Sequence, residues 1–275
     1  MRKKWARQGD SGKRQMAEGD TILRAARRIE AALAGEVVSV DSPSPRAKAV
    51  ALRSLDGKRL EAVGTHGKHL LLDLGDLVLH SHLGMSGAWH VYDHGAAWRK
   101  PPFTAWAVLR GERAEAVEFG GPTLRVLTRD ALRLDPLLAR LGPDVLSPDF
   151  DPGPIAALLR SAPEREVGDA LLDQRLVAGI GNIFKSEACF AARQDPWQPV
   201  GELSNAQLAR VAQAAHDLMR DAVDSGRHNH AVYRRAGRPC PSCGTPIRSR
   251  GQGDANRTTY WCRVCQARAW GTWQA

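Results

Sequence analysis

The sequence predicts an α+β fold, with an N-terminal helix and β-sandwich domain, a helical domain and a small C-terminal module built on four cysteines. Short apolar or alternating runs separated by turn residues occupy positions 37–127, which is typical of a β-sandwich. Beyond a stretch with five prolines, residues 136–154, the strand pattern disappears and helical spacing replaces it. Four of the five cysteines then fall within residues 240–265.

The N-terminal part opens with a polar segment, residues 1–15, that has no periodicity and is predicted to be a disordered basic tail. A helix is expected from about Asp20, a good N-cap, to Ala34, with Gly35 placed to end it. Its apolar residues recur at helical spacing, so one face should pack on a core. Strands are expected at residues 69–74, 77–82, 88–92, 103–110 and 114–119.

The proline-rich stretch is the expected joint between domains, and four helices are expected after it, at residues 155–160, 167–176, 183–192 and 204–224. The last helix opens with a capping box, Ser204 and Gln207, and Gly226 is placed to end it. The predicted bounds are 16–135 for the β-sandwich domain, 136–152 for the linker, 153–238 for the helical domain and 239–270 for the cysteine module.

The four cysteines predict a structural zinc finger. Cys240 and Cys243 form one CxxC pair, Cys262 and Cys265 form another, and 18 residues separate the pairs. Each pair can aim two sulfurs at one point, and the spacer is long enough for a β-hairpin. A disulfide framework is the weaker alternative, because nothing marks the chain as secreted. A closed four-thiolate site holds one Zn²⁺ for structure, so the function depends on what the module presents.

Basic residues are concentrated at both ends of the chain, whose formal net charge is +9. Residues 226–275 hold nine arginines and one acid, Asp254, which favours a phosphate-bearing partner over ordinary solvated charge. For the tail, ordinary solvated charge is the favoured interpretation. No apolar run approaches the roughly 20 residues of a membrane helix. The first fifteen residues also lack a signal peptide's apolar stretch, so we expect a cytoplasmic protein with no membrane partner.

Residues 171–187, with the sequence LLDQRLVAGIGNIFKSE, predict two helices joined by a glycine-bearing turn. Glycines allow the backbone to approach a partner closely, and the first amides of the second helix can seat a phosphate. Taken alone, such a turn is more often a tight connection than a binding site.

With other motifs, this segment resembles the helix–two-turn–helix of the formamidopyrimidine-DNA glycosylase / endonuclease VIII family of base-excision repair enzymes. The resemblance covers essentially residues 16–270. The other matching motifs are MAEGDT at 16–21, GTHGKH at 64–69, HSHLGMSG at 80–87, RLGPDVL at 140–146 and VYRRAGRP at 232–239. The Gly-Asp-Thr start, the WRKP stretch at 98–101 and the LGPDVL joint are more similar to the endonuclease VIII branch.

The resemblance implies a reaction at the mature N-terminal amine, normally that of a proline. The amine attacks C1′ of the damaged nucleotide, expels the base and forms a Schiff base, and elimination then cuts the strand on both sides of the sugar. Here the matching residue is Ala17, which follows Met16 and fifteen extra residues. Because an α-amine has a pKa of roughly 7.7–8.0, its neutral form is available near pH 7. We expect translation from Met16, or removal of the tail, to expose it. Glu18 matches the general acid/base.

The resemblance also assigns DNA contacts. Lys68 matches a lysine that contacts phosphate and assists β-elimination, and Arg257 matches the zinc-finger arginine that assists δ-elimination. Arg140 and Asn182 match phosphate-contacting positions. Met85 matches the side chain inserted into the gap left by a flipped base, and an unbranched apolar side chain suits such an irregular hole.

The predicted function is therefore that of a bifunctional DNA glycosylase and AP lyase that removes oxidised bases, pyrimidines foremost. Its partner would be double-stranded DNA with damaged bases or abasic sites, bound by a monomer in the cytoplasm, at the nucleoid. One alternative is a catalytically inactive damaged-DNA-binding protein of the same fold, because Ala17 replaces the proline and lies behind an extension. A zinc-ribbon transcription module would explain residues 239–266 but not Glu18 or Lys68. His80, His82 and Cys189 are interpreted as structural.

Overall fold

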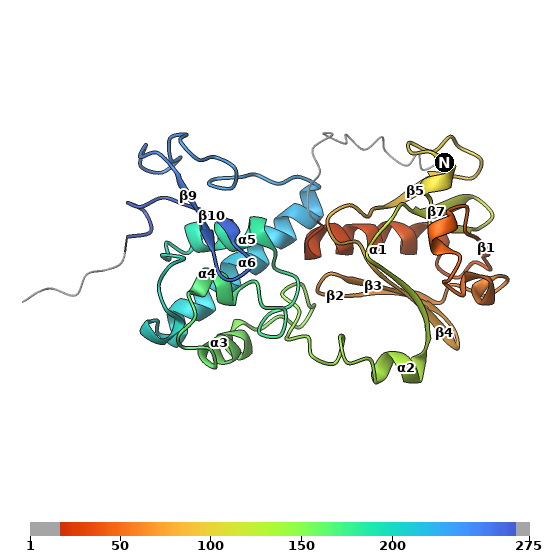
Figure 1. Cartoon of the computed structure of the whole chain (residues 1–275), viewed down its shortest axis with the longest axis horizontal. Coiled ribbons are helices and arrows are strands. Elements are labelled where there is room, and N and C mark those ends of the chain that lie inside the picture. The colour runs from red at the N-terminus through yellow and green to blue at the C-terminus, as the bar shows by residue number, and fades with distance from the viewer. Residues whose placement is uncertain (1–16, 268–275) are drawn as a thin grey trace, which may run out of the picture. The chain divides into compact units, whose positions relative to one another are not determined.

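The computed structural model describes residues 17–267 (Figure 1). The chain divides into two compact units, one ending at Ala139 and the other beginning at Arg140. The predicted tail, residues 1–15, and the last three residues of the predicted zinc finger, 268–270, lie outside the described part of the chain.

The N-terminal unit contains helix α1 (Gly19–Leu33), two four-stranded antiparallel sheets and a short helix, α2 (Arg129–Arg133). The first sheet has the order β1-β6-β7-β5, and its strands are β1 (Ser39–Asp41), β5 (Trp89–Asp93), β6 (Ala107–Arg110) and β7 (Ala114–Glu118). The second has the order β2-β3-β4-β8, and its strands are β2 (Ala62–His66), β3 (His69–Leu74), β4 (Leu77–His82) and β8 (Thr123–Thr128). The predicted helix and β-sandwich are confirmed.

Helix α1 fixes the N-terminal end of this unit because it contacts both sheets, β2 and β3 of one and β5 and β7 of the other. Ile22, Ile29 and Leu33 lie on one helix face, are fully buried and share a core cluster with Leu70 and Leu72 of β3. Each such side chain contributes about 1.5–3 kcal/mol by burial. The residues that begin the helix are therefore held on a firmly packed element.

Two predicted elements of this unit have different bounds. The helix begins at Gly19 with Glu18 as its N-cap, whereas Asp20 was the expected cap. Asp20 is instead buried inside the first turn, where its carboxylate pairs with Arg24 at 3.1 Å. The predicted strand at 103–110 is shorter at its start, since two consecutive prolines favour a 3₁₀ turn, η3 (Pro102–Thr104), before β6.

The C-terminal unit consists mainly of helices α3 (Pro152–Arg160), α4 (Val167–Ala170), α5 (Asn182–Ala191) and α6 (Asn205–Ser225). Helix α6 contacts α3 and α5. The predicted capping box at Ser204 and Gln207 is present, and Gly226 ends the helix in the left-handed conformation, with φ 70°. The predicted helix at 167–176 is confined to α4, because the Asp173 carboxylate accepts the backbone amide of Arg175 and forms a turn there.

The predicted hairpin between the cysteine pairs is also present. Strands β9 (Arg248–Gln252) and β10 (Arg257–Trp261) pair antiparallel, and β10 contacts α5. Among the described residues, no helix is both long enough and apolar enough to span a membrane.

Candidate functional site

Ala17 and Glu18, the residues predicted to supply an amine and an acid, lie directly before helix α1. Ala17 is half-buried against the core of the unit, and Glu18 is only 1% exposed. The Glu18 carbonyl accepts the amides of Thr21 and Ile22, at 3.0 and 3.2 Å, so the backbone at this point is part of the first helical turn. The two residues therefore occupy a defined position in the N-terminal unit.

Lys68 lies in a two-residue turn, with Gly67 at φ 59°, between paired residues His66 of β2 and His69 of β3. The register places His69 opposite His82 of β4, and their ring centroids are 4.7 Å apart. A tight hairpin therefore sets the position of Lys68. The next residue, His69, packs within a group of histidines.

A chain of polar contacts runs from this hairpin to the end of the unit. Asp135 pairs with Nη1 of Arg125 at 2.8 Å, and Nη2 of the same arginine lies 2.8 Å from Nδ1 of His80. A guanidinium only donates, so Nδ1 of His80 is the acceptor and its proton sits on Nε2. That nitrogen lies 2.8 Å from Nδ1 of His69. His69 therefore accepts there and carries its own proton on Nε2.

The three neighbouring histidines His69, His80 and His82 are held neutral. Burial, followed by the nearby His82 and His80, lowers the pKa of His69 to about 3. Burial, followed by the Arg125 guanidinium, lowers the pKa of His80 to about 4. Burial, followed by the Lys68 ammonium, also lowers the pKa of His82. At neutral pH these three imidazoles thus add no charge beside Lys68. The arrangement agrees with the structural role predicted for His80 and His82.

Met85 lies in the connection between β4 and β5, and its side chain is 64% exposed. Close packing holds this connection against the one between β7 and β8. A Cβ atom on Gly84 would meet Pro122 at 2.8 Å, and one on Gly87 would meet the carbonyl of Gly120 at 2.2 Å. The exposed apolar side chain is therefore presented by a constrained turn.

A buried acid lies beneath the same two connections. Glu118, the last residue of β7, accepts a hydrogen bond from Ser81 at 2.9 Å, and Trp89 donates to the serine oxygen at 3.1 Å. Burial raises the pKa of Glu118 to about 8. Its second oxygen is buried without a hydrogen-bond partner among the described residues. No motif in the sequence indicated Glu118, although an acid within the predicted strand 114–119 was a usable signal.

In the C-terminal unit, the structure brings two predicted phosphate contacts together. Asn182 is the first residue of α5 and is 7% exposed, and its side-chain amide donates to the main-chain oxygen of Thr258 at 2.8 Å. Arg257, the residue before Thr258, begins β10 and is exposed. Arg140 is also exposed, at the first position of the unit.

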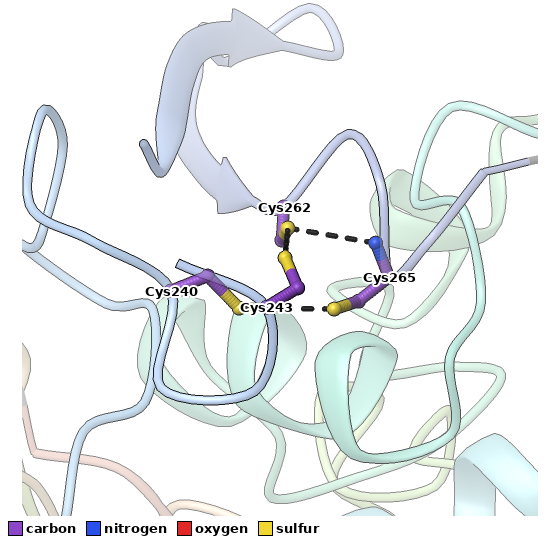
Figure 2. Close-up of side chains that lie close together, drawn as sticks. All are labelled: Cys240, Cys243, Cys262 and Cys265. Carbon is purple, nitrogen blue, oxygen red and sulfur yellow. Dashed lines mark hydrogen bonds between the residues drawn. The ribbon is translucent and has the colours of Figure 1, made fainter. Parts of the chain in front are cut away.

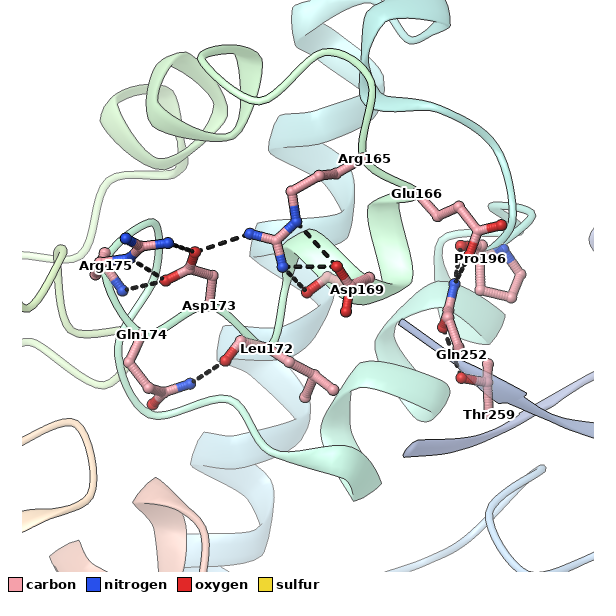
Figure 3. A network of polar contacts seen from close by, with 10 residues as sticks. All are labelled: Arg165, Glu166, Asp169, Leu172, Asp173, Gln174, Arg175, Pro196, Gln252 and Thr259. Carbon is pink, nitrogen blue, oxygen red and sulfur yellow. Dashed lines mark hydrogen bonds and ion pairs between the residues drawn. The ribbon is translucent and has the colours of Figure 1, made fainter. Parts of the chain in front are cut away.

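A buried hydrogen-bond network fixes the hairpin that carries Arg257 (Figure 3). The side-chain amide of Gln252 on β9 donates to Glu166 at 2.9 Å and to the carbonyl of Pro196 at 2.8 Å. Its carbonyl accepts the hydroxyl of Thr259 at 2.6 Å, and Thr259 in turn accepts from Lys185 of α5 at 2.5 Å. Lys185 is fully buried. Nothing in the sequence pattern indicated Gln252 or Lys185 as partners.

The helix–two-turn–helix segment is fixed by a second network in the same figure. Arg165 donates to Asp169 and Asp173, at 2.6 and 2.8 Å, and Arg175 pairs with Asp173 at 2.6 Å (Figure 3). Hydrogen bonds from these arginines, with Arg175 the largest contributor, lower the pKa of Asp173 far below its usual range.

Cys189 of α5 is fully buried, which raises its pKa to about 12 and agrees with a packing role.

The four predicted metal ligands converge on one point (Figure 2). Their sulfurs all lie within 4.8 Å of one another, with 3.7 Å between Cys240 and Cys265 and 3.4 Å between Cys243 and Cys262. A tetrahedral ion with bonds of about 2.3 Å to sulfur requires sulfurs about 3.8 Å apart, so the cluster fits a zinc-sized ion. Four cysteine sulfurs would fill all the ligand positions of such an ion and leave none for a substrate.

Each of the two units matches a domain of a known protein family. Residues 16–122 match the formamidopyrimidine-DNA glycosylase N-terminal domain, and residues 141–233 match the formamidopyrimidine-DNA glycosylase H2TH domain. Among curated proteins, a probable endonuclease 8 2 of Streptomyces coelicolor is 42% identical over 92% of this chain and 94% of its own. The DNA-(apurinic or apyrimidinic site) lyase Nei2 of Mycolicibacterium smegmatis is 37% identical over 91% of this chain and 99% of its own.

Among solved structures, the formamidopyrimidine-DNA glycosylase of Lactococcus lactis, non-covalently bound to DNA containing an abasic site, has the same fold. It superposes with a TM-score of 0.78 at 24% identity, over 91% of this chain and all of that one. The domain matches and the full-length relatives agree with the motifs from which the resemblance was inferred. The chain therefore belongs to the formamidopyrimidine-DNA glycosylase and endonuclease 8 family of DNA glycosylases and abasic-site lyases.

Proposed function

We propose that this protein is a bifunctional DNA glycosylase and abasic-site lyase that removes oxidised bases, pyrimidines foremost, from duplex DNA. The observation that carries the proposal is the hydrogen bond from Asn182 to Thr258, which joins two predicted phosphate contacts from distant parts of the sequence. The relatives named endonuclease 8 agree with the resemblance to the endonuclease VIII branch, on which the choice of oxidised pyrimidines is based.

The reaction would take place at Ala17 and Glu18. With residues 1–16 absent, Ala17 carries a free amine, whose nitrogen can attack C1′ while the bond from C1′ to the base breaks. The Glu18 carboxyl would deliver a proton to the sugar-ring oxygen as the ring opens. As the bond from C1′ to the ring oxygen breaks, the lone pair of the Ala17 nitrogen forms the C=N bond, so an imine joins Ala17 to C1′ and the former ring oxygen becomes a hydroxyl group. In the 275-residue sequence the Ala17 nitrogen lies in a peptide bond, which cannot form this imine.

The remaining residues would hold the DNA and support strand cleavage. The imine acidifies the proton at C2′, and its removal expels the 3′ phosphate, with Lys68 beside the phosphate group. A second elimination expels the 5′ phosphate, and Arg257 would stabilise the charge that develops there. Arg140 and Asn182 would contact neighbouring phosphates, and Met85 would fill the gap in the stack.

We infer that the four cysteines hold one Zn²⁺. The ion would supply structure only, since a site closed by four thiolates has no open position. Its effect on DNA binding would pass through the hairpin β9–β10, which lies between the two cysteine pairs and carries Arg257. We also propose that the protein acts as a cytoplasmic monomer.

Borohydride trapping tests the proposal. Protein beginning at Ala17 should become covalently attached to DNA with an oxidised pyrimidine or an abasic site, because borohydride reduces the imine to a stable amine. Protein with residues 1–16 verified intact by mass spectrometry should not be trapped. Efficient trapping of the intact form would assign the nucleophile to another amine.

Two further results separate glycosylase from lyase. Glu18→Gln in the Ala17 form should abolish release of the base yet leave some cutting at preformed abasic sites, where no base has to leave. If the Ala17 form binds damaged DNA but is not trapped on any substrate, the protein is a damaged-DNA-binding protein without catalysis. A comparison of oxidised pyrimidines with oxidised purines in the same duplex would test the lesion preference.

A further inference from the structure

The WRKP stretch at residues 98–101 has no part in the proposed reaction, yet it is firmly anchored. The indole nitrogen of Trp98 donates to Glu115 of β7 at 3.0 Å, and its ring stacks on Tyr92 of β5 with centroids 6.4 Å apart. The amide of Arg99 donates to the Tyr92 hydroxyl at 3.2 Å. The backbone that carries Arg99 therefore has a fixed position on this sheet.

Helix α1 brings two more arginines to the same place. Arg24 and Arg28 are four residues apart on the helix, so their side chains are neighbours. The helix contacts β5, the strand that precedes the WRKP stretch. Burial, followed by the Arg24 and Arg99 guanidiniums, lowers the pKa of Arg28. Arg24, Arg28 and Arg99 thus form one arginine cluster.

The positive charges of this cluster are only partly compensated. Arg24 pairs with the buried Asp20 at 3.1 Å. Arg28 is half-buried and Arg99 is exposed, and within the described part of the chain neither of them forms an ion pair. The cluster therefore has two guanidinium charges more than its one acid can balance.

The acid that anchors the WRKP stretch does not supply the missing negative charge. One oxygen of Glu115 accepts the indole N–H of Trp98, and the other accepts the Nε of Arg110 at 3.1 Å. Arg110 also pairs with Asp41 at 3.6 Å. Both carboxylates are thus engaged by other groups.

An anion bound at the cluster would balance these charges. A guanidinium that is partly removed from water beside like charges is unfavourable unless an anion neutralises it. Arginine binds phosphate through two parallel N–H···O bonds, which makes it the preferred side chain for this anion. Duplex DNA, on which this protein family acts, carries one phosphate charge for roughly every 1.7 Å of its axis.

We propose that Arg28 and Arg99, with Arg24 beside them, bind one phosphate of the DNA backbone on the N-terminal unit. The inference rests on the proposed function and adds a contact that the family resemblance did not assign. Arg28 lies about 15 Å along the helix axis from Glu18, at about 1.5 Å per residue. A phosphate held there would fix the DNA relative to the helix that follows the reacting residues, at a point away from the lesion.

Binding to a duplex with a tetrahydrofuran abasic analogue tests this, because the analogue cannot form an imine and the full chain can be used. Arg28→Gln and Arg99→Gln should each weaken binding about tenfold, the loss expected for a charge-assisted hydrogen bond. The double variant should lower the slope of log K against log salt by about 0.9, the share of one phosphate. Arg113→Gln is the matched control, since this arginine is 88% exposed in the same unit and lies 3.9 Å from Glu36. It should change neither quantity.

Thermal unfolding without DNA separates a lost contact from a folding defect. Arg28→Gln should unfold at the wild-type temperature or above it, because the substitution removes a half-buried charge and its repulsion from two others. A variant that loses both stability and DNA affinity would give the arginine a structural role and contradict the proposal.

A single neutral methylphosphonate, moved along each strand of the duplex, identifies the phosphate. At one position it should weaken binding by the wild-type protein but not by the double variant, which has already lost that contact. Equal weakening of both proteins at every position would mean that no backbone phosphate binds the cluster. If inorganic phosphate protects the wild type from heat but not the double variant, while their salt slopes are equal, the site takes a free phosphate and the proposal fails.

The same measurements distinguish this inference from the proposed function. A wild-type protein that does not bind the tetrahydrofuran duplex would contradict the proposed function, and the inference with it. Wild-type binding that the double variant matches at every salt concentration would contradict the phosphate contact alone.

Discussion

The side-chain amide of Asn182 donates a 2.8 Å hydrogen bond to the main-chain oxygen of Thr258. This bond connects the first turn of α5 to the residue after Arg257, the first residue of β10. A DNA phosphate bound at the amino end of α5 would therefore also lie beside the hairpin β9–β10. The hydrogen bond thus joins the helix–two-turn–helix to the cysteine module at the residues proposed to contact phosphate.

Replacing Arg257 with Ala should reduce the salt dependence of DNA binding. Each phosphate neutralised in duplex DNA contributes about 0.9 to the slope of log K against log salt, so the slope should fall by about that amount. Arg248→Ala removes the same charge at the opposite end of the hairpin, where Arg248 pairs with Trp261. It should change the slope less. Equal slopes for wild type and Arg257→Ala would remove Arg257 from the phosphate contacts.

Gln252→Leu should destabilise the C-terminal unit. The substitution removes the acceptor of Thr259 and the donor to the carbonyl of Pro196, and each buried polar group left without a partner costs about 1–3 kcal/mol. Urea denaturation of the metal-loaded protein would measure the loss. Gln213, which bonds Asp217 on the surface of α6, is the control, and its replacement by Leu should cost less than about 0.5 kcal/mol. Similar midpoints for both variants would show that the network adds no net stability.

The contrast between Gln252 and the cysteines shows what the sequence could predict. The two CxxC pairs lie close together in the sequence, and each pair can aim two sulfurs at one point. The metal site was therefore predicted from the sequence alone. Gln252 contacts Glu166 and Pro196, which lie 86 and 56 residues away. A single sequence carries no signal for such long-range pairs. The same holds for Asn182, whose predicted phosphate role gave no indication of its bond to Thr258.

Two predicted element bounds were wrong. Asp20 has the chemistry of an N-cap, yet it is buried and paired with Arg24 while Glu18 occupies the cap position. Phe103 reads as the start of a strand, but the prolines before it impose a 3₁₀ turn that leaves the ring exposed. The first departure lies beside Ala17 and Glu18, the residues proposed to carry the reaction.

Cys262→Ser should release the metal and abolish specific binding to abasic DNA, because the hairpin loses its anchor at the end of β10. Metal content by mass spectrometry and DNA affinity should fall together. Cys189→Ser is the control, since Cys189 is buried in α5 and is not among the four clustered cysteines. It should keep the metal. Wild-type protein with no bound zinc would contradict the assignment of the ion.

Glu118→Gln should become more stable relative to wild type as pH rises. The pKa of Glu118 is raised from 4.5 to about 8, so between these values the folded protein holds a proton that the unfolded chain has released. This contribution to stability is present below pH 4.5 and is lost as pH rises toward 8. Gln keeps the shape without titrating. Thermal unfolding at pH 5 and pH 8 should show a smaller decrease for the variant, and parallel decreases would mean that Glu118 is ionised in the folded protein.

His80→Gln should make the N-terminal unit less sensitive to acid. The pKa of His80 is lowered from 6.5 to about 4, so below pH 6.5 the unfolded chain takes up a proton that the folded protein refuses. The contribution of neutral His80 to the free energy of unfolding is therefore present above pH 6.5 and is lost as pH falls toward 4. Gln can accept from Arg125 and donate to His69 without titrating, so its unfolding temperature should decrease less between pH 7.5 and pH 5. His80→Phe removes both hydrogen bonds and should be less stable at every pH, by about 1–3 kcal/mol for each buried group left unpaired. If His80→Gln follows the wild-type acid dependence, the proton is taken up elsewhere and the chain from Asp135 to His69 does not control it.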